Sequence, residues 1–266
     1  MNSLVRSLCE RKLLEPPPFL SRCMQFEVSM GSRAFGTSGA GSDWDVYGFC
    51  IPPAEVTEFQ DFTALDQSIS IAGEVRQYDF KIWSLDQFWT RLLIGKSQTV
   101  ETLFTAESNV LFMTPAAKLL RDNRQLLLHQ GTAREFRRFA KQQFDDLVER
   151  RRQDAKRKEY IALWGYDVKA AYHVVRLMTE AQELLEQGTL HLGSNRATLM
   201  SIRSGQWKLE QVVAAFHQLD EQLAKLATST KLPAQANADA IASLLLQVRA
   251  AAYDSSLQLQ HRDERQ

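Results

Sequence analysis

The residues best suited to chemistry lie between residues 31 and 48, where a Gly-Ser turn is followed by two aspartates. Gly31 and Ser32 follow a run that suits a short strand, and N–H groups at such a turn, with the positive end of a helix dipole, favour an anion such as a phosphate. Asp43 and Asp45 are two residues apart, so on a strand both carboxylates lie on one face. Such neighbours repel unless a cation lies between them, and a few oxygen ligands suit Mg²⁺ or Mn²⁺ better than Zn²⁺. The stretch therefore predicts a phosphate site beside a metal site.

Taken singly, each motif is common and also fits a plain turn and a solvated strand face, but the combination is more specific. Gly-Ser-Arg-Ala-Phe-Gly-Thr at 31–37 and Ser-Asp-Trp-Asp-Val-Tyr-Gly-Phe-Cys-Ile-Pro-Pro at 42–53 resemble the nucleotidyltransferase superfamily of DNA polymerase beta. More narrowly, they resemble the group of nucleotidyltransferases often found associated with RNA ligases. The resemblance covers most of residues 24–215 and is strongest over 31–53. It implies an α+β fold, with a minimal polymerase-beta-like core of a short mixed sheet and flanking helices, plus a C-terminal helical domain.

The resemblance also implies an activity and roles for individual residues. A metal-dependent nucleotidyltransferase moves a nucleoside monophosphate from an NTP to an acceptor hydroxyl and releases pyrophosphate, with two metal ions stabilising the attacking and leaving oxygens. Asp43 and Asp45 would bridge the metals. Asp79, on the next matching strand, would supply the third carboxylate and help to take the proton of the acceptor hydroxyl. Gly31 and Ser32 would hold the leaving phosphates.

Two of these assignments leave alternatives open. A slip of one residue in strand register would turn Asp79 to the other face of the sheet. Three further acids lie close to it in sequence, namely Asp61, Asp66 and Glu74. Arg33 is expected to reach a triphosphate oxygen, or else to remain solvated or salt-bridged at the start of a helix.

A second set of candidate residues lies in the C-terminal part of the chain. Lys169, His173 and Arg176 fall at i, i+4 and i+7, so all three share one face of a helix. This basic face suits contact with a triphosphate or an RNA backbone, and the resemblance favours that interpretation. The alternatives are a solvated basic face, or a His173 packed in the core. Tyr166 could stack on a base, or it could be a buried residue that anchors the interdomain surface.

The elements that must position these residues follow from periodicity and turn signals. We expect a helix at 3–14 and strands near 23–30, 43–51 and 73–83, with 36–41 a loop and 54–70 left open. A capping box at Ser84 and a proline at 115 predict two further helices. Long helices are expected over about 132–160, 166–187, 208–227 and 238–256. The predicted domains are residues 1–110, the nucleotidyltransferase core, and residues 111–266, a helical domain that closes the active-site cleft.

Composition sets wider limits on the protein. With 266 residues, 44% of them hydrophobic and 24% charged, the chain reads as an ordinary globular protein. Its net charge is zero, so no overall basic character indicates nucleic acid. Residues 134–158 hold ten Lys or Arg against five Asp or Glu. A helix there could contact phosphates, although the interleaved acids also fit a solvated face.

Three cysteines, Cys9, Cys23 and Cys50, form no Cys-x-x-Cys pair, which argues against a disulfide framework or a structural zinc site. We therefore expect a cytoplasmic protein, with no membrane partner because no apolar run approaches the length of a membrane span. The association with RNA ligases points to an RNA end, such as that of a tRNA, as acceptor. A protein or small-molecule hydroxyl, or a non-catalytic nucleotide-binding module, remains open, and the sequence does not specify the NTP or the oligomeric state.

Overall fold

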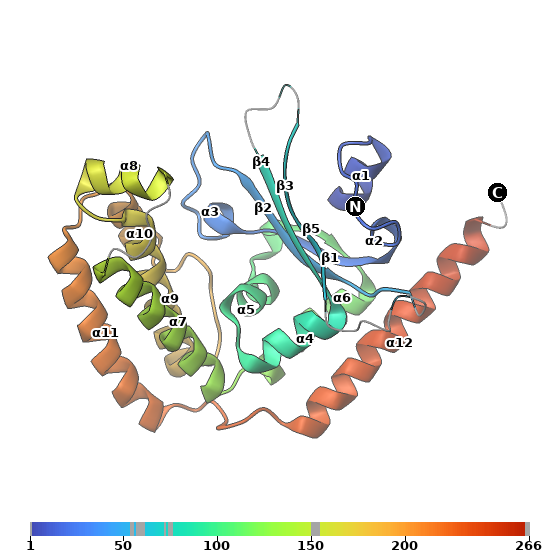
Figure 1. Ribbon diagram of the computed structural model, residues 1–266. Helices are drawn as coiled ribbons and strands as arrows, with labels where there is room; N and C mark the ends of the chain where they lie inside the picture. The colour runs from blue at the N-terminus through green and yellow to red at the C-terminus, as the bar shows by residue number, and fades with distance from the viewer. Residues whose placement is uncertain are drawn as a thin grey trace. The chain divides into compact units, whose positions relative to one another are not determined.

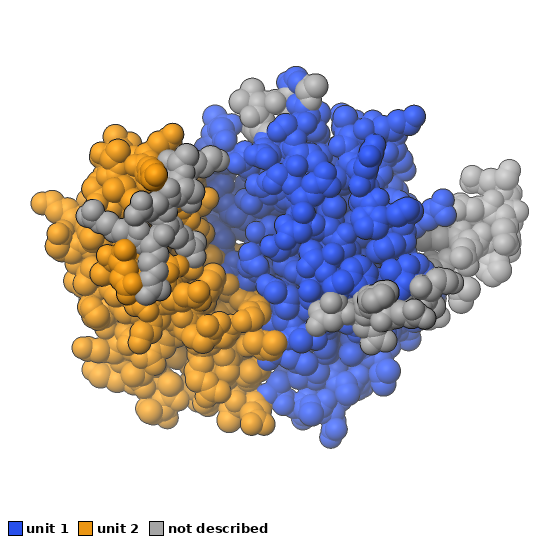
Figure 2. All heavy atoms as spheres, in the orientation of Figure 1, with its two compact units in different colours: residues 1–93, 98–127, 236–266 blue, residues 94–97, 128–235 orange. Residues whose placement is uncertain are grey.

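The structure is a computed structural model. It describes residues 2–53, 56, 62–71, 73, 77–149 and 155–263, and only the backbone of 155–156 and 254–263. The chain forms two compact units (Figure 2). Unit 1 comprises residues 1–93, 98–127 and 236–266, and unit 2 comprises residues 94–97 and 128–235. The predicted boundary after residue 110 differs from this division, because strand β5 (Val110–Met113) pairs with β1 (Met24–Ser29), and the C-terminal helix α12 (Ala238–Asp263) packs on α6 (Pro115–Asp122).

Unit 1 is built on a five-stranded mixed sheet with the order β3-β4-β2-β1-β5 (Figure 1). Its strands are β1 (Met24–Ser29), β2 (Trp44–Cys50), β3 (Thr63–Ser70), β4 (Gln77–Ser84) and β5 (Val110–Met113). Among the strands that the structure describes, β2 and β4 are parallel to each other, whereas β1 is antiparallel to β2 and β5, and β3 is antiparallel to β4. The helices of unit 1 are α1 (Leu4–Glu10), α2 (Leu20–Cys23), α3 (Gly31–Ala34), α4 (Leu85–Ile94), α5 (Ser97–Phe104), α6 (Pro115–Asp122) and α12 (Ala238–Asp263). The predicted α+β class is therefore confirmed.

Alternation along the strands gives the sheet two different faces. On one face Val46 and Phe80 join the buried cluster formed with α1 and α2. On the other face Phe49 and Trp83 pack their rings against Phe88 of α4. We call this second face the carboxylate face, because Asp45 and Asp79 lie on it further along the same two strands.

A buried glutamate ties the N-terminal segment to the sheet. Glu27 lies in β1 and is 0% exposed. Its carboxylate accepts hydrogen bonds from the Leu4 N–H at 2.6 Å and from the Ser3 hydroxyl, so it satisfies donors at the start of α1. Burial raises the pKa of Glu27 above its ordinary value, because desolvation disfavours the charged form.

Both predicted helix starts in unit 1 carry an N-cap hydrogen bond. At the capping box predicted for Ser84, the Ser84 N–H donates to the Phe62 carbonyl at 3.0 Å, and the Gln87 side chain accepts from the Thr63 hydroxyl at 2.8 Å. The Ser84 hydroxyl accepts a hydrogen bond from the Gln87 N–H at 3.2 Å, and α4 follows. The Thr114 hydroxyl accepts one from the Ala117 N–H at 3.3 Å, with Pro115 at the first position of α6.

Unit 2 is helical. It contains α7 (Gln130–Val148), α8 (Ala155–Trp164), α9 (Val168–Gln187), α10 (Arg196–Arg203) and α11 (Leu209–Ser229). Helix α9 is the centre of the unit and packs against α7, α8, α10 and α11. The single helix predicted over 132–160 corresponds to α7 and α8, and residues 150–154 between them lie outside the described residues. Within the described ranges, no helix combines the length and apolar character needed to cross a membrane.

The elements that were not predicted include β5, β3 and α10. Strand β5 has four residues and β3 lies at the edge of the sheet with mostly exposed residues, so neither shows a clear buried alternation. Helix α10 has eight residues, too short for a strong periodic signal. Strand β5 is held by β1, a segment distant in sequence, and local periodicity does not report such a contact.

Candidate functional site

Asp45 and Asp79 are direct neighbours on the carboxylate face. Strands β2 and β4 run parallel with Asp45 paired to Asp79 in register. Adjacent strands are about 4.8 Å apart and paired residues point to the same face, so the two carboxylates lie side by side. This register is the one that the site prediction for Asp79 requires.

Asp43 lies just before β2 and faces the start of β4. Its Oδ1 accepts a hydrogen bond from the Gln77 N–H at 3.3 Å. Gln77 is two residues before Asp79 on β4, so the three predicted acids line the same end of the parallel strand pair. Sequence spacing placed Asp43 and Asp45 together, and the structure adds the backbone donor that orients Asp43.

The Gly-Ser turn packs directly against Asp45. A Cβ on Gly31 would lie 1.8 Å from Asp45 Oδ2, and Gly31 has φ +57°, so both the contact and the backbone favour glycine. The Met30 N–H donates to the Asp45 carbonyl at 2.7 Å. The backbone of the predicted phosphate site is therefore in contact with a predicted metal ligand.

The helix that follows this turn is short. Helix α3 has four residues, so its macrodipole is small and the first N–H groups and the Ser32 hydroxyl must supply any anion contact. The Ser32 carbonyl accepts a hydrogen bond from the Thr37 N–H at 2.8 Å, which closes the turn. The predicted helix dipole thus contributes less than the sequence suggested.

Arg33 lies along the opposite side of β2. Its guanidinium carbon is 3.9 Å from the centre of the Trp44 ring, and Nη2 donates to the Ser42 carbonyl at 3.3 Å. Trp44 itself stacks on Tyr78 with centroids 6.3 Å apart. These contacts hold Arg33 beside the strand that carries Asp45, and its predicted triphosphate contact stays a prediction.

Strand β3 adds a residue that sequence reasoning missed. Ser68 pairs with Asp79 across the antiparallel β3–β4 ladder, and its hydroxyl donates to Asp79 Oδ1. Two residues after Asp79 on β4, Lys81 forms an ion pair with Asp66 of β3 at 3.1 Å. The sequence carried a weak signal, since Asp66, Ser68 and Ser70 alternate as polar residues.

The donor set fits a hard divalent cation. Mg²⁺ is commonly bound through one or two carboxylates together with water and substrate phosphates, and Asp45 with Asp79 supplies such a pair. Among the residues that the structure describes, no three His, Cys, Asp or Glu side chains gather into a metal-binding group. Any third protein ligand, with Asp43 the nearest candidate in sequence, would therefore need to reorient.

The basic face predicted on α9 is only partly exposed. Lys169 is exposed and His173 is half-buried. Arg176 is 6% exposed and forms an ion pair with Glu180 at 3.2 Å. The helical spacing of the three residues is confirmed, but Arg176 lies in the packed interior of unit 2, so the expected face of three solvent-accessible cations is not formed.

Two residues at the start of α9 have structural roles. Tyr166 is 5% exposed and its hydroxyl donates to the Trp207 carbonyl at 2.8 Å, so it is buried and bonded within unit 2, and the interdomain role of the second alternative stays a prediction. Asp167 caps α9 by accepting from the Lys169 N–H at 3.0 Å, and it also binds Arg157 Nη1 at 2.5 and 2.7 Å. The cap is visible in the sequence as an acid before a helix, but the ion pair is not.

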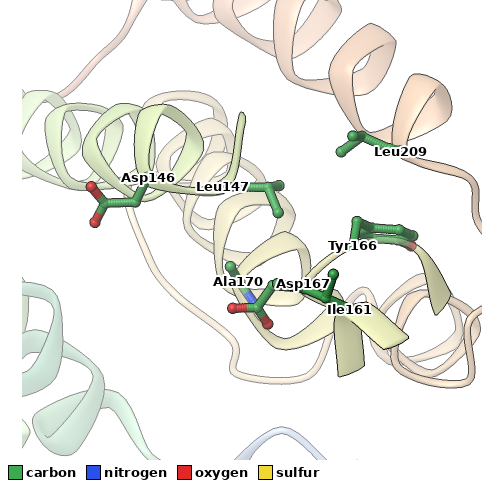
Figure 3. Close-up of a pocket in the computed structure, with 7 residues that line it drawn as sticks. All are labelled: Asp146, Leu147, Ile161, Tyr166, Asp167, Ala170 and Leu209. Atoms are coloured by element: carbon green, nitrogen blue, oxygen red, sulfur yellow. The ribbon is translucent and has the colours of Figure 1, made fainter. Parts of the chain in front are cut away.

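Tyr166 and Asp167 also line a small pocket of unit 2, together with Asp146, Leu147, Ile161, Ala170 and Leu209 (Figure 3). Its volume is about 10 Å³, enough for a single water molecule. The pocket is therefore too small to hold a nucleotide.

Comparisons with known proteins agree with the motifs. The family model described as the RNA repair pathway DNA polymerase beta family matches residues 23–247. No curated protein matches the chain. A solved structure of a nucleotidyltransferase-like protein from Exiguobacterium sibiricum covers 85% of this chain and 73% of its own, at 11% identity. Its TM-score of 0.31 is too low to support an argument. The family match spans most of the chain, and the chain therefore belongs to the RNA repair pathway DNA polymerase beta family.

Proposed function

We propose that this protein is a divalent-metal-dependent nucleotidyltransferase that transfers a nucleoside monophosphate from an NTP to the 3′ hydroxyl of an RNA, such as a tRNA. The observation that carries the proposal is the contact of the Gly31 turn with Asp45, which is itself paired in register with Asp79. The predicted phosphate-binding turn is thus in contact with one of two neighbouring carboxylates, which supports the proposal. The family's role in RNA repair supports RNA as the acceptor.

In this proposal Asp45, Asp79 and Asp43 hold Mg²⁺ or Mn²⁺, and bound metal would stabilise charge on the attacking and leaving oxygens. The N–H groups at Gly31 and the Ser32 hydroxyl bind the departing phosphates. A carboxylate oxygen of Asp79 accepts the proton of the acceptor hydroxyl, while Ser68 fixes the orientation of that carboxylate.

Three free cysteines, Cys9, Cys23 and Cys50, support a cytoplasmic location.

Unit 2 has a more limited part in the proposal. Lys169 and His173 are its candidates for nucleotide contact, since both have accessible surface. Arg176 would act indirectly, by holding α9 through Glu180. Whether unit 2 closes over the carboxylates stays a prediction.

The test is transfer of label from each of the four α-labelled ribonucleotides to total RNA and to a protein extract, with Mg²⁺ or Mn²⁺ and product sizing. Asp45→Asn should lower RNA labelling at least about 10²-fold, as expected for loss of a group that acts on the transition state. Asp66→Asn is the matched control, because Asp66 lies in β3 beside Lys81 and is 63% exposed.

Equal labelling by the two variants would contradict the proposed site. Label in protein or in a small molecule would retain the chemistry and reject RNA as acceptor. Triphosphate binding without transfer would indicate a non-catalytic nucleotide-binding module.

A further inference from the structure

One stretch of unit 2 has an unusual charge composition. The 23 residues from Gln187 to Leu209 include no Asp or Glu, although acids make up 32 of the 266 residues of the chain. The same stretch contains three cations, Arg196, Arg203 and Lys208, and all three are exposed. The stretch is therefore locally basic in a chain whose net charge is zero.

Helix α10 lies in this stretch and has two distinct sides. Leu199 and Ile202 are both 0% exposed and face the interior of unit 2. Arg196, Met200 and Arg203 fall at i, i+4 and i+7 and are exposed, so they share the outer side. The outer side thus presents a cation, an apolar side chain and a second cation in a row.

An exposed tryptophan borders this helix. Trp164, the last residue of α8, is 38% exposed. A Cβ on Gly205 would lie 2.0 Å from the Trp164 ring, so the ring packs against the backbone just after α10. The Tyr166 hydroxyl bonds the Trp207 carbonyl and fixes the chain after α8 to the same segment. The ring and the cations therefore belong to one part of unit 2.

We propose that Trp164, Arg196, Met200, Arg203 and Lys208 form a binding surface for single-stranded RNA, which we call the α10 surface. Cations bind the phosphates, and the indole ring stacks on an unpaired base, as in other single-strand binding surfaces. An acidic polypeptide would use the cations but would gain little from the ring. This inference rests on the proposed function, for which it names the surface that holds the acceptor.

The test is the affinity of the full chain for a fluorescein-labelled single-stranded RNA, measured by anisotropy over a series of salt concentrations in EDTA without NTP. For R196Q/R203Q the slope of log K against log salt should fall by about 1.4, since each phosphate contact on a single strand contributes about 0.7. At about 0.15 M salt the same relation predicts roughly tenfold weaker binding. The double variant K225Q/K231Q removes two exposed cations of unit 2 elsewhere and should bind as the wild type does.

Trp164→Leu keeps an apolar side chain against Gly205 but removes the ring, and should weaken binding at least about fivefold. Trp164→Phe should restore most of the loss, because a phenyl ring can still stack. Thermal melts of all variants check that they fold.

The inference is overturned if the two double variants lose RNA affinity equally or if neither loses any. It is also overturned if the wild type binds no RNA. Competition by polyglutamate that matches unlabelled RNA would overturn it too, since this would indicate an acidic protein partner. Because the assay needs no catalysis, the transfer assay with Asp45→Asn tests the proposed function separately.

Discussion

The contact between Gly31 and Asp45 leads to a sharp prediction for Gly31→Ala. A methyl group at Gly31 would lie 1.8 Å from Asp45 Oδ2, whereas ordinary van der Waals contact begins at 3.4 Å. Either the carboxylate or the turn must therefore move by roughly 1.5 Å. Asp45 is the predicted metal ligand, so this displacement occurs where the reaction is proposed to take place.

The expected effect is large on activity and smaller on stability. A misplacement of about 1 Å in a catalytic group can cost about 10²-fold in rate, so we expect transfer to fall at least about 10²-fold. The left-handed conformation of Gly31, φ +57°, costs an alanine about 1–2 kcal/mol. The variant should therefore fold, with a lower melting temperature, while losing most of its activity.

The assay is RNA labelling alongside thermal denaturation, with Gly39→Ala as the matched control. Gly39 lies in the loop that leads to Asp43, and the position of its Cβ has no atom within 4 Å. The control should retain activity and stability. The reasoning is refuted if Gly31→Ala keeps wild-type transfer, or if Gly39→Ala loses as much.

Two further variants test other contacts of unit 1. Ser68→Ala removes the hydroxyl that orients Asp79 and should weaken the apparent Mg²⁺ affinity of the transfer reaction about tenfold. The control is Ser70→Ala, because Ser70 is exposed on the same strand. An unchanged Mg²⁺ titration for Ser68→Ala would count against this role of Ser68. Glu27→Gln tests the buried carboxylate, whose pKa is raised by desolvation: the wild type loses stability as the pH rises through this raised folded-state pKa, whereas glutamine does not titrate. The unfolding free energy of Glu27→Gln, measured by denaturant titration, should therefore increase relative to wild type with rising pH, and a difference that is constant with pH would contradict the assignment.

The local arrangement of the candidate residues between 31 and 45 was predictable because its determinants lie close together in sequence. The Gly-Ser turn and the Asp-x-Asp pair lie within 15 residues, and strand alternation alone places Asp43 and Asp45 on one face. The register of Asp79 was not determined by its own strand. It depends on parallel pairing with β2, a contact across 34 residues of chain.

What the sequence could not indicate depends on contacts between distant segments. Ser68 reaches Asp79 only because β3 pairs with β4. Arg176 and Lys169 have the same charge and share a helix face, but the packing of α9 inside unit 2 buries one and exposes the other. A helical pattern gives the angle between side chains, and only the neighbouring helices decide which part of that face meets solvent.

The position of Asp45 is determined from several directions at once. Its carbonyl accepts the Met30 N–H, and β4 pairs along its other edge. The next residue, Val46, is 0% exposed in the core on the opposite face, so the strand cannot shift without opening that core. In the proposed function, a backbone held this way would position the Asp45 carboxylate before substrate arrives, which is the condition under which electrostatic stabilisation of a transition state is most effective.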